Sequence, residues 1–283
     1  MEVRLAQNYG FCFGVKRAIK IAEERKNAIT LGPLIHNAKE IARLKKDYNV
    51  DTSETLENLQ KGRELIVRTH GIPKRDLERL QAQKFEVIDA TCPFVRKPQM
   101  IVEEMSAKGY DIIVFGDEEH PEVKGVISYA HTNLNTQDCA PNVKVVANME
   151  ELSHLRLGKK IALISQTTKQ PEIFSQIASY LIMRVAEVRV FNTICNATFD
   201  NQRAADTLSR EVDIMIIVGG KNSSNTKQLL MICKENCEHS YLVEDEKELQ
   251  NAWFANKKIC GITAGASTPD WIIQRVKEKI VAF

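Results

Sequence analysis

Short apolar runs alternate with helix-periodic stretches along the whole chain. The runs are nearly continuous in Val, Ile and Leu, a pattern typical of parallel strands that are covered on both faces. They predict buried strands at residues 64–70, 85–91, 111–116, 160–166, 188–194, 213–219 and 258–264.

Between these runs, apolar residues recur with the period of a helix. Val15, Ala18, Ile19 and Ala22 share one face of a predicted helix, and Lys and Glu occupy the rest. The stretches TKQLLMICKE and PDWIIQRVKEKI predict two more helices. Alternation of strands and helices is typical of α/β proteins with parallel sheets.

The predicted strands fall into three clusters, and no linker rich in Gly, Pro or Ser separates them. The sequence therefore predicts three small α/β lobes packed around a common centre. We place the lobe boundaries at residues 1–92, 93–192 and 193–283.

The charge balance argues against one class of function, nucleic-acid binding. The chain has 283 residues, 43% of them apolar, which is enough to bury a core. Its 39 basic and 37 acidic residues leave a net charge of +2, and no basic block stands out. Nucleic-acid binding is therefore disfavoured, because it needs a strongly basic face.

No targeting or membrane segment is recognisable. No apolar run approaches the roughly 18–20 residues that a membrane span needs, and MEVRLAQNYG lacks the features of a signal peptide. We therefore expect a cytoplasmic protein. A monomer is assumed, because no feature of the sequence indicates the oligomeric state. Seven cysteines in such a chain indicate metal or redox chemistry rather than disulfides.

Three of the cysteines follow β-rich runs, in VRLAQNYGFCFGV, EVIDATCPFV and RVFNTICNAT. Cys12, Cys92 and Cys195 stand beside Gly, Pro or other small residues, far too distant in sequence for a finger-type zinc site. A [4Fe–4S] cluster normally takes four cysteines, so three would leave one iron open to a substrate oxygen. Packing as small buried hydrophobes is the alternative interpretation.

The remaining cysteines lack such a setting. Cys260 lies inside an apolar run and Cys139 in a polar stretch. Cys233 and Cys237 are one turn apart on a predicted helix with His239 nearby, but one turn supplies only two good ligands. We expect all four to have structural rather than metal-binding roles.

Polar residues collect after the predicted strands, where ligands of parallel α/β sheets bind. His36, His70 and His120 follow strands in turn-like contexts and can donate to phosphate oxygens. His131, His154 and His239 lack this context, so we expect them on the surface.

Two hydroxyl-rich loops, GGKNSSNT and TAGASTPD, each open a predicted helix, whose N-terminus attracts anions. In the second, Thr268 is expected to cap the helix and Pro269 to begin it. Met215 stands where an ATP-binding P-loop needs Gly, which disfavours that motif. Ordinary helix capping is the alternative for both loops.

Glu122 follows His-Pro at a predicted helix start. A carboxylate is favoured there by the helix dipole alone. If buried beside a substrate hydroxyl it would instead shuttle protons, and the hydroxyl of Thr167 would orient that proton.

These residues lie in motifs of a known family. The chain carries GFCFGVKRAI, GPLIHN, THG, DATCP, HPEVKG, QTT, TICNAT, KNSSNT and TAGAS in order. In this it resembles the 4-hydroxy-3-methylbut-2-enyl diphosphate reductases (the LytB family), which catalyse the last step of the non-mevalonate isoprenoid pathway. The resemblance covers nearly the whole chain.

The resemblance implies three parallel-sheet α/β lobes in a pseudo-threefold arrangement around one central [4Fe–4S] cluster, held by Cys12, Cys92 and Cys195. It implies catalytic roles for Glu122, Thr167 and His120, and ferredoxin or flavodoxin as the electron donor. The substrate would be an allylic diphosphate, reduced to isopentenyl and dimethylallyl diphosphate. The implied substrate-binding residues are His36, His70, His120, Thr167, Ser223, Ser224, Asn225 and Ser267.

One position departs from the family. After TICNAT the family usually shows Arg-Gln, and this chain has Asn201-Gln202, with Arg203 out of register. Two other interpretations stay open. A quinolinate synthase-like enzyme would share the three cysteines but need a dicarboxylate pocket. A non-enzymatic iron–sulfur redox protein would favour four cysteine ligands and need neither the histidines nor the hydroxyl loops.

Overall fold

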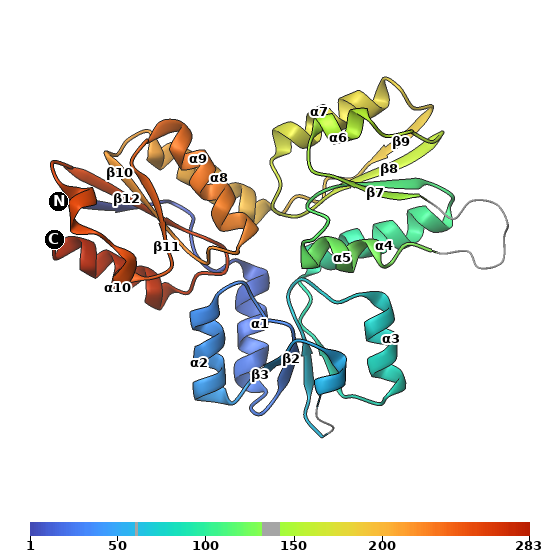
Figure 1. Cartoon of the computed structure of the whole chain (residues 1–283), viewed down its shortest axis with the longest axis horizontal. Coiled ribbons are helices and arrows are strands. Elements are labelled where there is room, and N and C mark those ends of the chain that lie inside the picture. The colour runs from blue at the N-terminus through green and yellow to red at the C-terminus, as the bar shows by residue number, and fades with distance from the viewer. Residues whose placement is uncertain (60–61, 132–141) are drawn as a thin grey trace. The chain divides into compact units, whose positions relative to one another are not determined.

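The computed structural model describes residues 1–59, 62–131 and 142–283. It contains three four-stranded parallel sheets flanked by helices (Figure 1). The predicted α/β class is therefore confirmed. The chain divides into two compact units. The first comprises Met1–Asn27, Pro33–Asp51 and Asn196–Phe283, and the second Ala28–Gly32 and Thr52–Cys195.

The first unit is built on one sheet. In spatial order its strands are β1 (Glu2–Leu5), β12 (Ile259–Ala264), β10 (Ile214–Val218) and β11 (Ser240–Val243). Its α-helices are α1 (Phe13–Glu24), α2 (Ala38–Tyr48), α8 (Asn196–Ser209), α9 (Ser224–Asn236) and α10 (Asp270–Val281). Two 3-10 helices complete it, Glu246–Glu248 and Asn251–Phe254.

Strand β10 shows why this sheet is buried on both faces. Ile214, Ile216 and Val218 pack with apolar residues of α10. Met215 and Ile217 point the other way and pack with residues of α8 and α9. Successive strand residues face opposite sides, so a continuous apolar run is the pattern that such a central strand requires.

The second unit contains the other two sheets. Their strands, in spatial order, are β3 (Asp51–Ser53), β2 (Ile29–Leu31), β4 (Leu65–Val67) and β5 (Val87–Asp89), and β7 (Val143–Val146), β6 (Asp111–Phe115), β8 (Lys160–Ser165) and β9 (Glu187–Val190). Its helices are α3 (Lys74–Ala82), α4 (Pro93–Ala107), α5 (Pro121–Ile127), α6 (Met149–Ser153), α7 (Pro171–Ile182) and a 3-10 turn at Leu56–Asn58.

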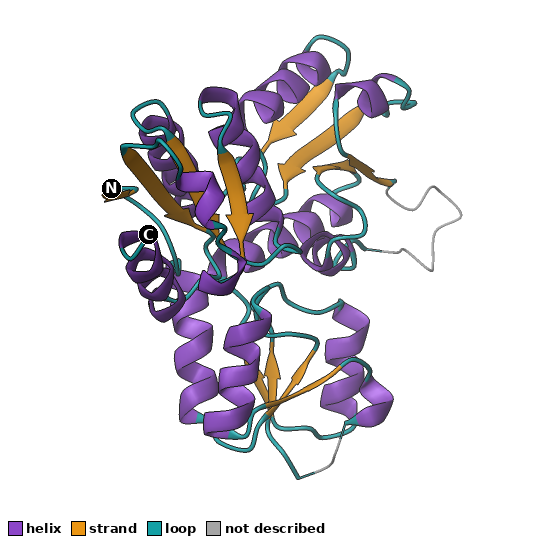
Figure 2. Cartoon of the chain, turned by 60° about the vertical axis from the view of Figure 1, so that its left-hand side comes forward, coloured by secondary structure: helices purple, strands orange, loops and turns teal. Residues whose placement is uncertain are grey.

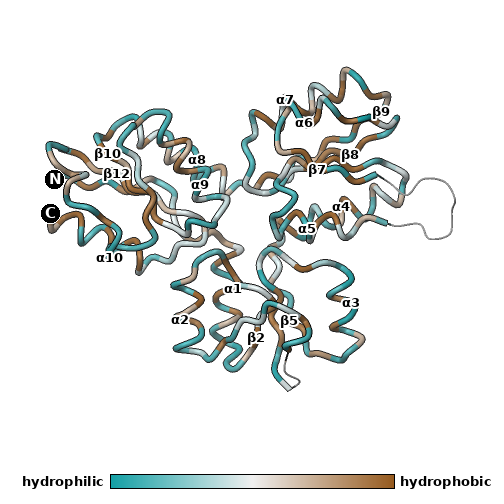
Figure 3. The backbone as a smooth tube through the Cα atoms, viewed as in Figure 1, coloured by the Kyte–Doolittle hydropathy of each residue, from teal (hydrophilic) through white to brown (hydrophobic). Residues whose placement is uncertain are grey.

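Helices cover both faces of the sheet around β6 and β8 (Figure 2). Ile112 and Val114 pack against α4 and α5, and Ile113 and Phe115 against α6 and α7. The strands accordingly carry the brown of apolar residues (Figure 3). Among the described residues, every helix is too short or too polar to cross a bilayer.

All seven predicted strands occur, and each is shorter than expected. Strands β2, β3, β7 and β11 were not predicted, because they have only three or four residues each. Strand β1 pairs with β12, Glu2 opposite Ile259, so the first strand of the chain lies at the edge of the last sheet. The three lobe boundaries and the arrangement around a centre stay predictions.

Candidate functional site

Three cysteines stand at the starts of helices. Cys12 is the N-cap residue of α1, Cys92 is the N-cap of α4, and Cys195 directly precedes α8. The expected strand over residues 188–194 was too long, because β9 ends at Val190. The hydroxyl of Thr193 accepts from the N–H of Ser165 (2.8 Å) and donates to its carbonyl (2.6 Å). The Thr193 hydroxyl thus takes the place of backbone hydrogen bonds between strands, and residues 191–195 form a loop.

The other described cysteines lie inside the first unit. Cys233 in α9 and Cys260 in β12 are fully buried, and Cys237 at the end of α9 is nearly so. Burial raises the pKa of the Cys233 and Cys260 thiols to about 12, so both stay protonated near neutral pH. Their expected structural role fits this setting. Cys139 lies outside the described residues, and the described cysteines form no disulfide.

The helices that follow the three cysteines lack an acidic residue in the first turn. Of the ten α-helices in the described chain, four have none there, namely α1, α4, α8 and α9. The other six carry Asp or Glu in that turn. Acidic residues normally complement the positive end of the helix dipole. These four helix N-termini can therefore interact with other anions, such as thiolates or phosphates.

Helix α9 begins in the SSN loop. Ser223 caps it by accepting from the N–H of Thr226 (3.3 Å). Asn225 is only 4% exposed, and within the described chain neither its amide nitrogen nor its oxygen has a hydrogen-bond partner. An unsatisfied buried amide costs about 1–3 kcal/mol. The amide nitrogen can thus donate to a bound anion, whereas the amide oxygen needs a donor such as water.

The first unit brings its predicted site residues together. A Cβ on Gly220 would lie 2.6 Å from the carbonyl oxygen of His36, so only glycine lets the His36 loop approach the SSN loop this closely. The N–H of Gly265 donates to Val218 (2.9 Å), which sets the Ser267 loop beside the end of β10. The N–H of Cys12 in turn donates to the carbonyl of Ala266 (3.2 Å).

Thr268 does not cap α10 as expected. Its hydroxyl donates instead to the carbonyl of Val218 (3.0 Å), and Pro269 takes the N-cap position. Thr268 is 1% exposed, so its hydroxyl needs a partner inside the protein. The bond helps to hold the Ser267 loop against β10.

The second unit ties its two cysteines to loops with predicted site residues. The N–H of Cys92 donates to the carbonyl of Thr69 (3.0 Å), the neighbour of His70. The N–H of Cys195 donates to the carbonyl of Thr167 (2.9 Å). Together with the bond from Cys12, each of the three cysteines is thus held by its backbone to a loop of the candidate site in its own unit.

Glu122 and Thr167 form a buried pair. The backbone N–H and the hydroxyl of Thr167 donate to the two carboxylate oxygens of Glu122, each at 2.7 Å. Glu122 is 3% exposed and Thr167 is 7% exposed. Burial raises the pKa of Glu122, and the two hydrogen bonds from Thr167 partly offset that rise. Such a carboxyl group is suited to proton transfer.

The rings of His70 and His120 lie edge to face, with centroids 5.7 Å apart. His120 is the N-cap of α5, and its Nδ1 accepts from the N–H of Glu122 (3.2 Å). A neutral imidazole that accepts at Nδ1 carries its proton on Nε2. His120 is therefore set to donate from Nε2, as a phosphate ligand must. His131, His154 and His239 are exposed, as predicted.

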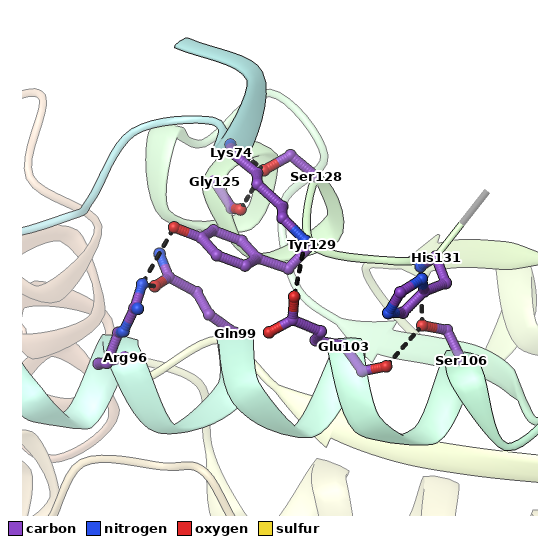
Figure 4. Close-up of polar contacts among 9 residues, drawn as sticks. All are labelled: Lys74, Arg96, Gln99, Glu103, Ser106, Gly125, Ser128, Tyr129 and His131. Atoms are coloured by element: carbon purple, nitrogen blue, oxygen red, sulfur yellow. Dashed lines mark hydrogen bonds and ion pairs between the residues drawn. The ribbon is translucent and has the colours of Figure 1, made fainter. Parts of the chain in front are cut away.

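A polar brace links the start of α3, which follows the His70 loop in sequence, to α4 and the end of α5 (Figure 4). Arg96, one turn after Cys92, donates to the Tyr129 hydroxyl (3.1 Å) and to Oε1 of Gln99 (3.2 Å). Lys74 pairs with Glu103 (2.6 Å). The side chains of the brace thus come from α3, α4 and the end of α5.

The backbone between Gly71 and Lys74 also contacts α4 and the end of α5. The N–H of Lys74 donates to the hydroxyl of Ser128 (2.9 Å), which donates to the carbonyl of Gly125 (2.6 Å). Gly71 has a φ of +72°, and a Cβ there would lie 2.6 Å from Nε2 of Gln99. Gln99 is 1% exposed. These contacts were not predicted, because no sequence motif indicates them.

No metal-binding group is assembled by side chains alone. In residues 1–59, 62–131 and 142–283, no three His, Cys, Asp or Glu side chains are grouped to hold a metal ion. Cys12 belongs to the first unit, and Cys92 and Cys195 belong to the second. Their meeting at one cluster therefore stays a prediction.

The sequence matches the profile of the family described as LytB protein over residues 3–281. The chain belongs to the LytB family.

Its relatives in that family are alike along their full length. The 4-hydroxy-3-methylbut-2-enyl diphosphate reductase of Helicobacter hepaticus is 62% identical over 280 residues, 99% of each chain. The protein of the same name from Wolinella succinogenes is 60% identical over 283 residues, 100% of this chain and 99% of that one.

Two solved structures also match the LytB chain. A structure of (E)-4-hydroxy-3-methyl-but-2-enyl diphosphate reductase, the terminal enzyme of the non-mevalonate pathway, is 40% identical, covers 100% of both chains and has a TM-score of 0.71. The E-1-hydroxy-2-methyl-but-2-enyl-4-diphosphate reductase of Plasmodium falciparum is 27% identical over 99% of this chain and 87% of that one, with a TM-score of 0.88.

The departure at Asn201 lies inside α8. Asn201 and Gln202 are both buried, whereas Arg203 is exposed. The usual LytB arginine would thus place a long cation at a buried position here. Arg203 and Asp200 instead line a cavity of about 400 Å³ between α8 and the residues after β1.

Gln166 is a buried polar residue beside the LytB motif QTT that the sequence analysis left unassigned. It is 2% exposed, and its Oε1 accepts from the N–H of Asp117 (3.0 Å). Its Nε2 has no hydrogen-bond partner within the described chain. Adjacency to Thr167 was the signal that could have found it.

Proposed function

We propose that this chain reductively removes the hydroxyl group of (E)-4-hydroxy-3-methylbut-2-enyl diphosphate, giving isopentenyl and dimethylallyl diphosphate in the last step of the non-mevalonate pathway. One observation carries the proposal. Cys12, Cys92 and Cys195 each precede a helix with no acid in its first turn, and each is bonded through its N–H to a candidate-site loop. Membership in the LytB family supports the same reaction.

The proposed cofactor is one [4Fe–4S] cluster held by Cys12, Cys92 and Cys195. When bound, it supplies single electrons and an iron that accepts the substrate oxygen. The donor set fits, because cysteine thiolates are the usual ligands of such a cluster, and Cys12, Cys92 and Cys195 each stand at the start of a helix. Cys233 and Cys260 do not fit, since burial raises the pKa of each thiol to about 12.

The diphosphate is proposed to bind through neutral donors and helix N-termini rather than a basic block. The first unit offers Asn225 with a buried unsatisfied amide and Ser223 at the start of α9. The second unit offers His70 and His120. The proposed ligands are His36, His70, His120, Thr167, Ser223, Ser224, Asn225 and Ser267.

Glu122, Thr167 and His120 are the proposed catalytic residues. Loss of the hydroxyl as water consumes two electrons and two protons, and a C–H bond replaces the C–O bond. Burial raises the pKa of Glu122, which favours its carrying one of these protons. Once protonated, its carboxyl group donates to the hydroxyl of Thr167, and that hydroxyl is then free to donate to the substrate oxygen.

Several broader predictions belong to the same proposal. The chain is a cytoplasmic monomer of three lobes, residues 1–92, 93–192 and 193–283, in a pseudo-threefold arrangement around the cluster. Ferredoxin or flavodoxin supplies the electrons. These points follow from the family resemblance and from the sequence pattern.

The decisive test combines anaerobic iron and sulfide analysis with turnover of the diphosphate. We expect about four iron and four sulfide ions per chain, and water release coupled to two-electron oxidation of a reductant. Cys12→Ser, Cys92→Ser and Cys195→Ser should each lose iron, and Cys260→Ser is the matched control that keeps it. If the cluster-containing protein shows no spectral change with the diphosphate and no turnover, the proposed function is wrong and the protein is an electron carrier instead.

A further inference from the structure

The outer face of α1 is basic and begins with an exposed aromatic residue. Phe13, Lys16, Arg17 and Lys20 recur at the spacing that places residues on one side of a helix. The opposite side, with Val15, Ala18, Ile19 and Ala22, is buried. Phe13 is 65% exposed, one of the most exposed large apolar side chains described. We call this set, with Ile21 and Glu24, the α1 face.

The charges of the α1 face oppose the stability of the helix. Residues 13–22 contain three basic and no acidic residues, in a chain whose net charge is only +2. Cations near a helix N-terminus are disfavoured by the dipole, and like charges at i, i+4 such as Lys16 and Lys20 repel each other. Lys20 lies 3.8 Å from the exposed Glu24 one turn later, a contact too long and too solvated to offset this repulsion fully. An acidic partner would relieve it.

The shape of the face suits a protein rather than a small molecule. The α1 face lines a surface groove of about 350 Å³ that is formed by this single helix. Small-molecule sites are usually concave and walled by several elements. An exposed aromatic residue with a polar, charged rim is instead typical of a protein interface.

We infer that the α1 face docks a small acidic protein that delivers electrons one at a time. The inference rests on the proposed function, since Phe13 directly follows the proposed ligand Cys12. Phe13 to Lys20 spans about 10 Å along the helix. A carrier bound to these residues therefore lies close to Cys12, at the start of the same helix. Each docking event oxidises one carrier by one electron, and two events supply the pair that the reaction consumes.

Binding is tested with reduced, acidic flavodoxin and the cluster-loaded enzyme, by anaerobic calorimetry at low ionic strength. Lys16→Glu and Lys20→Glu should each raise the Kd roughly tenfold and flatten its dependence on salt, because charge complementarity at an interface rim acts in this way. Lys46→Glu on α2 is the matched control, an exposed lysine of the same unit, and should change the Kd less than about twofold.

Lys97→Glu tests the rival face. Helix α4 also begins at a proposed ligand, Cys92, and carries the exposed Phe94 and Met100. If Lys97→Glu weakens flavodoxin binding as much as Lys16→Glu does, or if Lys16→Glu and Lys20→Glu bind normally, the inference is overturned.

Turnover separates this inference from the proposed function. With dithionite, which needs no docking surface, Lys16→Glu and Lys20→Glu should match the unmodified enzyme. With flavodoxin they should show a raised KM for the carrier and an unchanged kcat at saturation. An enzyme inactive even with dithionite refutes the proposed function. Equal losses with both reductants refute the docking role alone.

Discussion

Both carboxylate oxygens of Glu122 accept hydrogen bonds from one residue, Thr167, whose backbone N–H and hydroxyl each donate at 2.7 Å. The two residues come from the start of α5 and the loop after β8. The carbonyl of Thr167 also accepts from the N–H of Cys195 (2.9 Å). Thr167 therefore holds the Glu122 carboxylate with its N–H and hydroxyl, and the backbone of the proposed iron ligand Cys195 with its carbonyl.

Glu122→Gln should stabilise the protein increasingly as pH rises. Burial raises the folded-state pKa of Glu122 above its ordinary value of 4.5. The contribution of Glu122 to the free energy of unfolding is thus fully present below its ordinary pKa. It declines as pH rises through the pKa of Glu122 in the folded protein. The glutamine variant never ionises at this position, and its amide keeps both partners. Thermal unfolding at about pH 4.5 and about pH 8 should show a Tm advantage for the variant only at the higher pH, and a constant difference would contradict it.

Thr167→Val should lower kcat about a hundredfold, within the range for lost proton-transfer groups. The substitution removes the hydroxyl that bonds Glu122 but keeps the backbone N–H in place. Thr167→Ser retains the hydroxyl and should stay within a few-fold of the unmodified rate. Steady-state kinetics with dithionite measures both. Equal rates for the Val and Ser variants would exclude the hydroxyl from proton transfer.

Local pattern predicted much of this fold. Continuous apolar runs such as that of β10 report burial on both faces, and the spacing of Val15, Ala18, Ile19 and Ala22 reports the buried side of α1. Pairing was not predictable in the same way. Nothing near Glu2 indicates that it lies opposite Ile259, because any apolar strand can pair with another.

The candidate site was likewise predictable from the sequence only in part. Residue types and their positions after strands singled out His120, Glu122 and Thr167, whose contacts the structure then supplied. Gln99 was missed, since a buried amide on a helix carries no sequence signal until its neighbour Gly71 is known. Tertiary contacts between distant segments make such residues important, and periodicity does not report them.

Gly71→Ala should destabilise the protein more than Gly109→Ala. Both glycines have left-handed backbones, with φ of +72° and +76°, which cost a non-glycine residue about 1–2 kcal/mol. A Cβ on Gly109 meets nothing within 4 Å, whereas one on Gly71 would lie 2.6 Å from Nε2 of Gln99. Gly109→Ala therefore measures the backbone cost alone. Urea unfolding should give a further loss of about 1 kcal/mol or more for Gly71→Ala.

The same comparison has a functional arm. Gly71 follows His70, so displacement of the loop in the Gly71→Ala variant should also raise the KM for the diphosphate, while Gly109→Ala leaves it unchanged. If both variants lose equal stability and keep the same KM, the close packing of Gly71 against Gln99 is unimportant for the loop.

Glu40→Leu should cost about 2–3 kcal/mol of unfolding free energy, because it removes a buried acceptor and leaves half-buried donors without it. Glu40 is 1% exposed, pairs with Arg43 (2.6 Å) and accepts from the indole N–H of Trp271 (2.9 Å), joining α2 to α10. Arg43 keeps its 2.6 Å contact to Glu23, which limits the loss. Glu104→Leu is the control, since Glu104 pairs with Lys108 at an exposed position on α4, where such pairs contribute at most about 0.5 kcal/mol. Urea unfolding measures both variants, and equal losses would show that the buried pair contributes no more than a surface one.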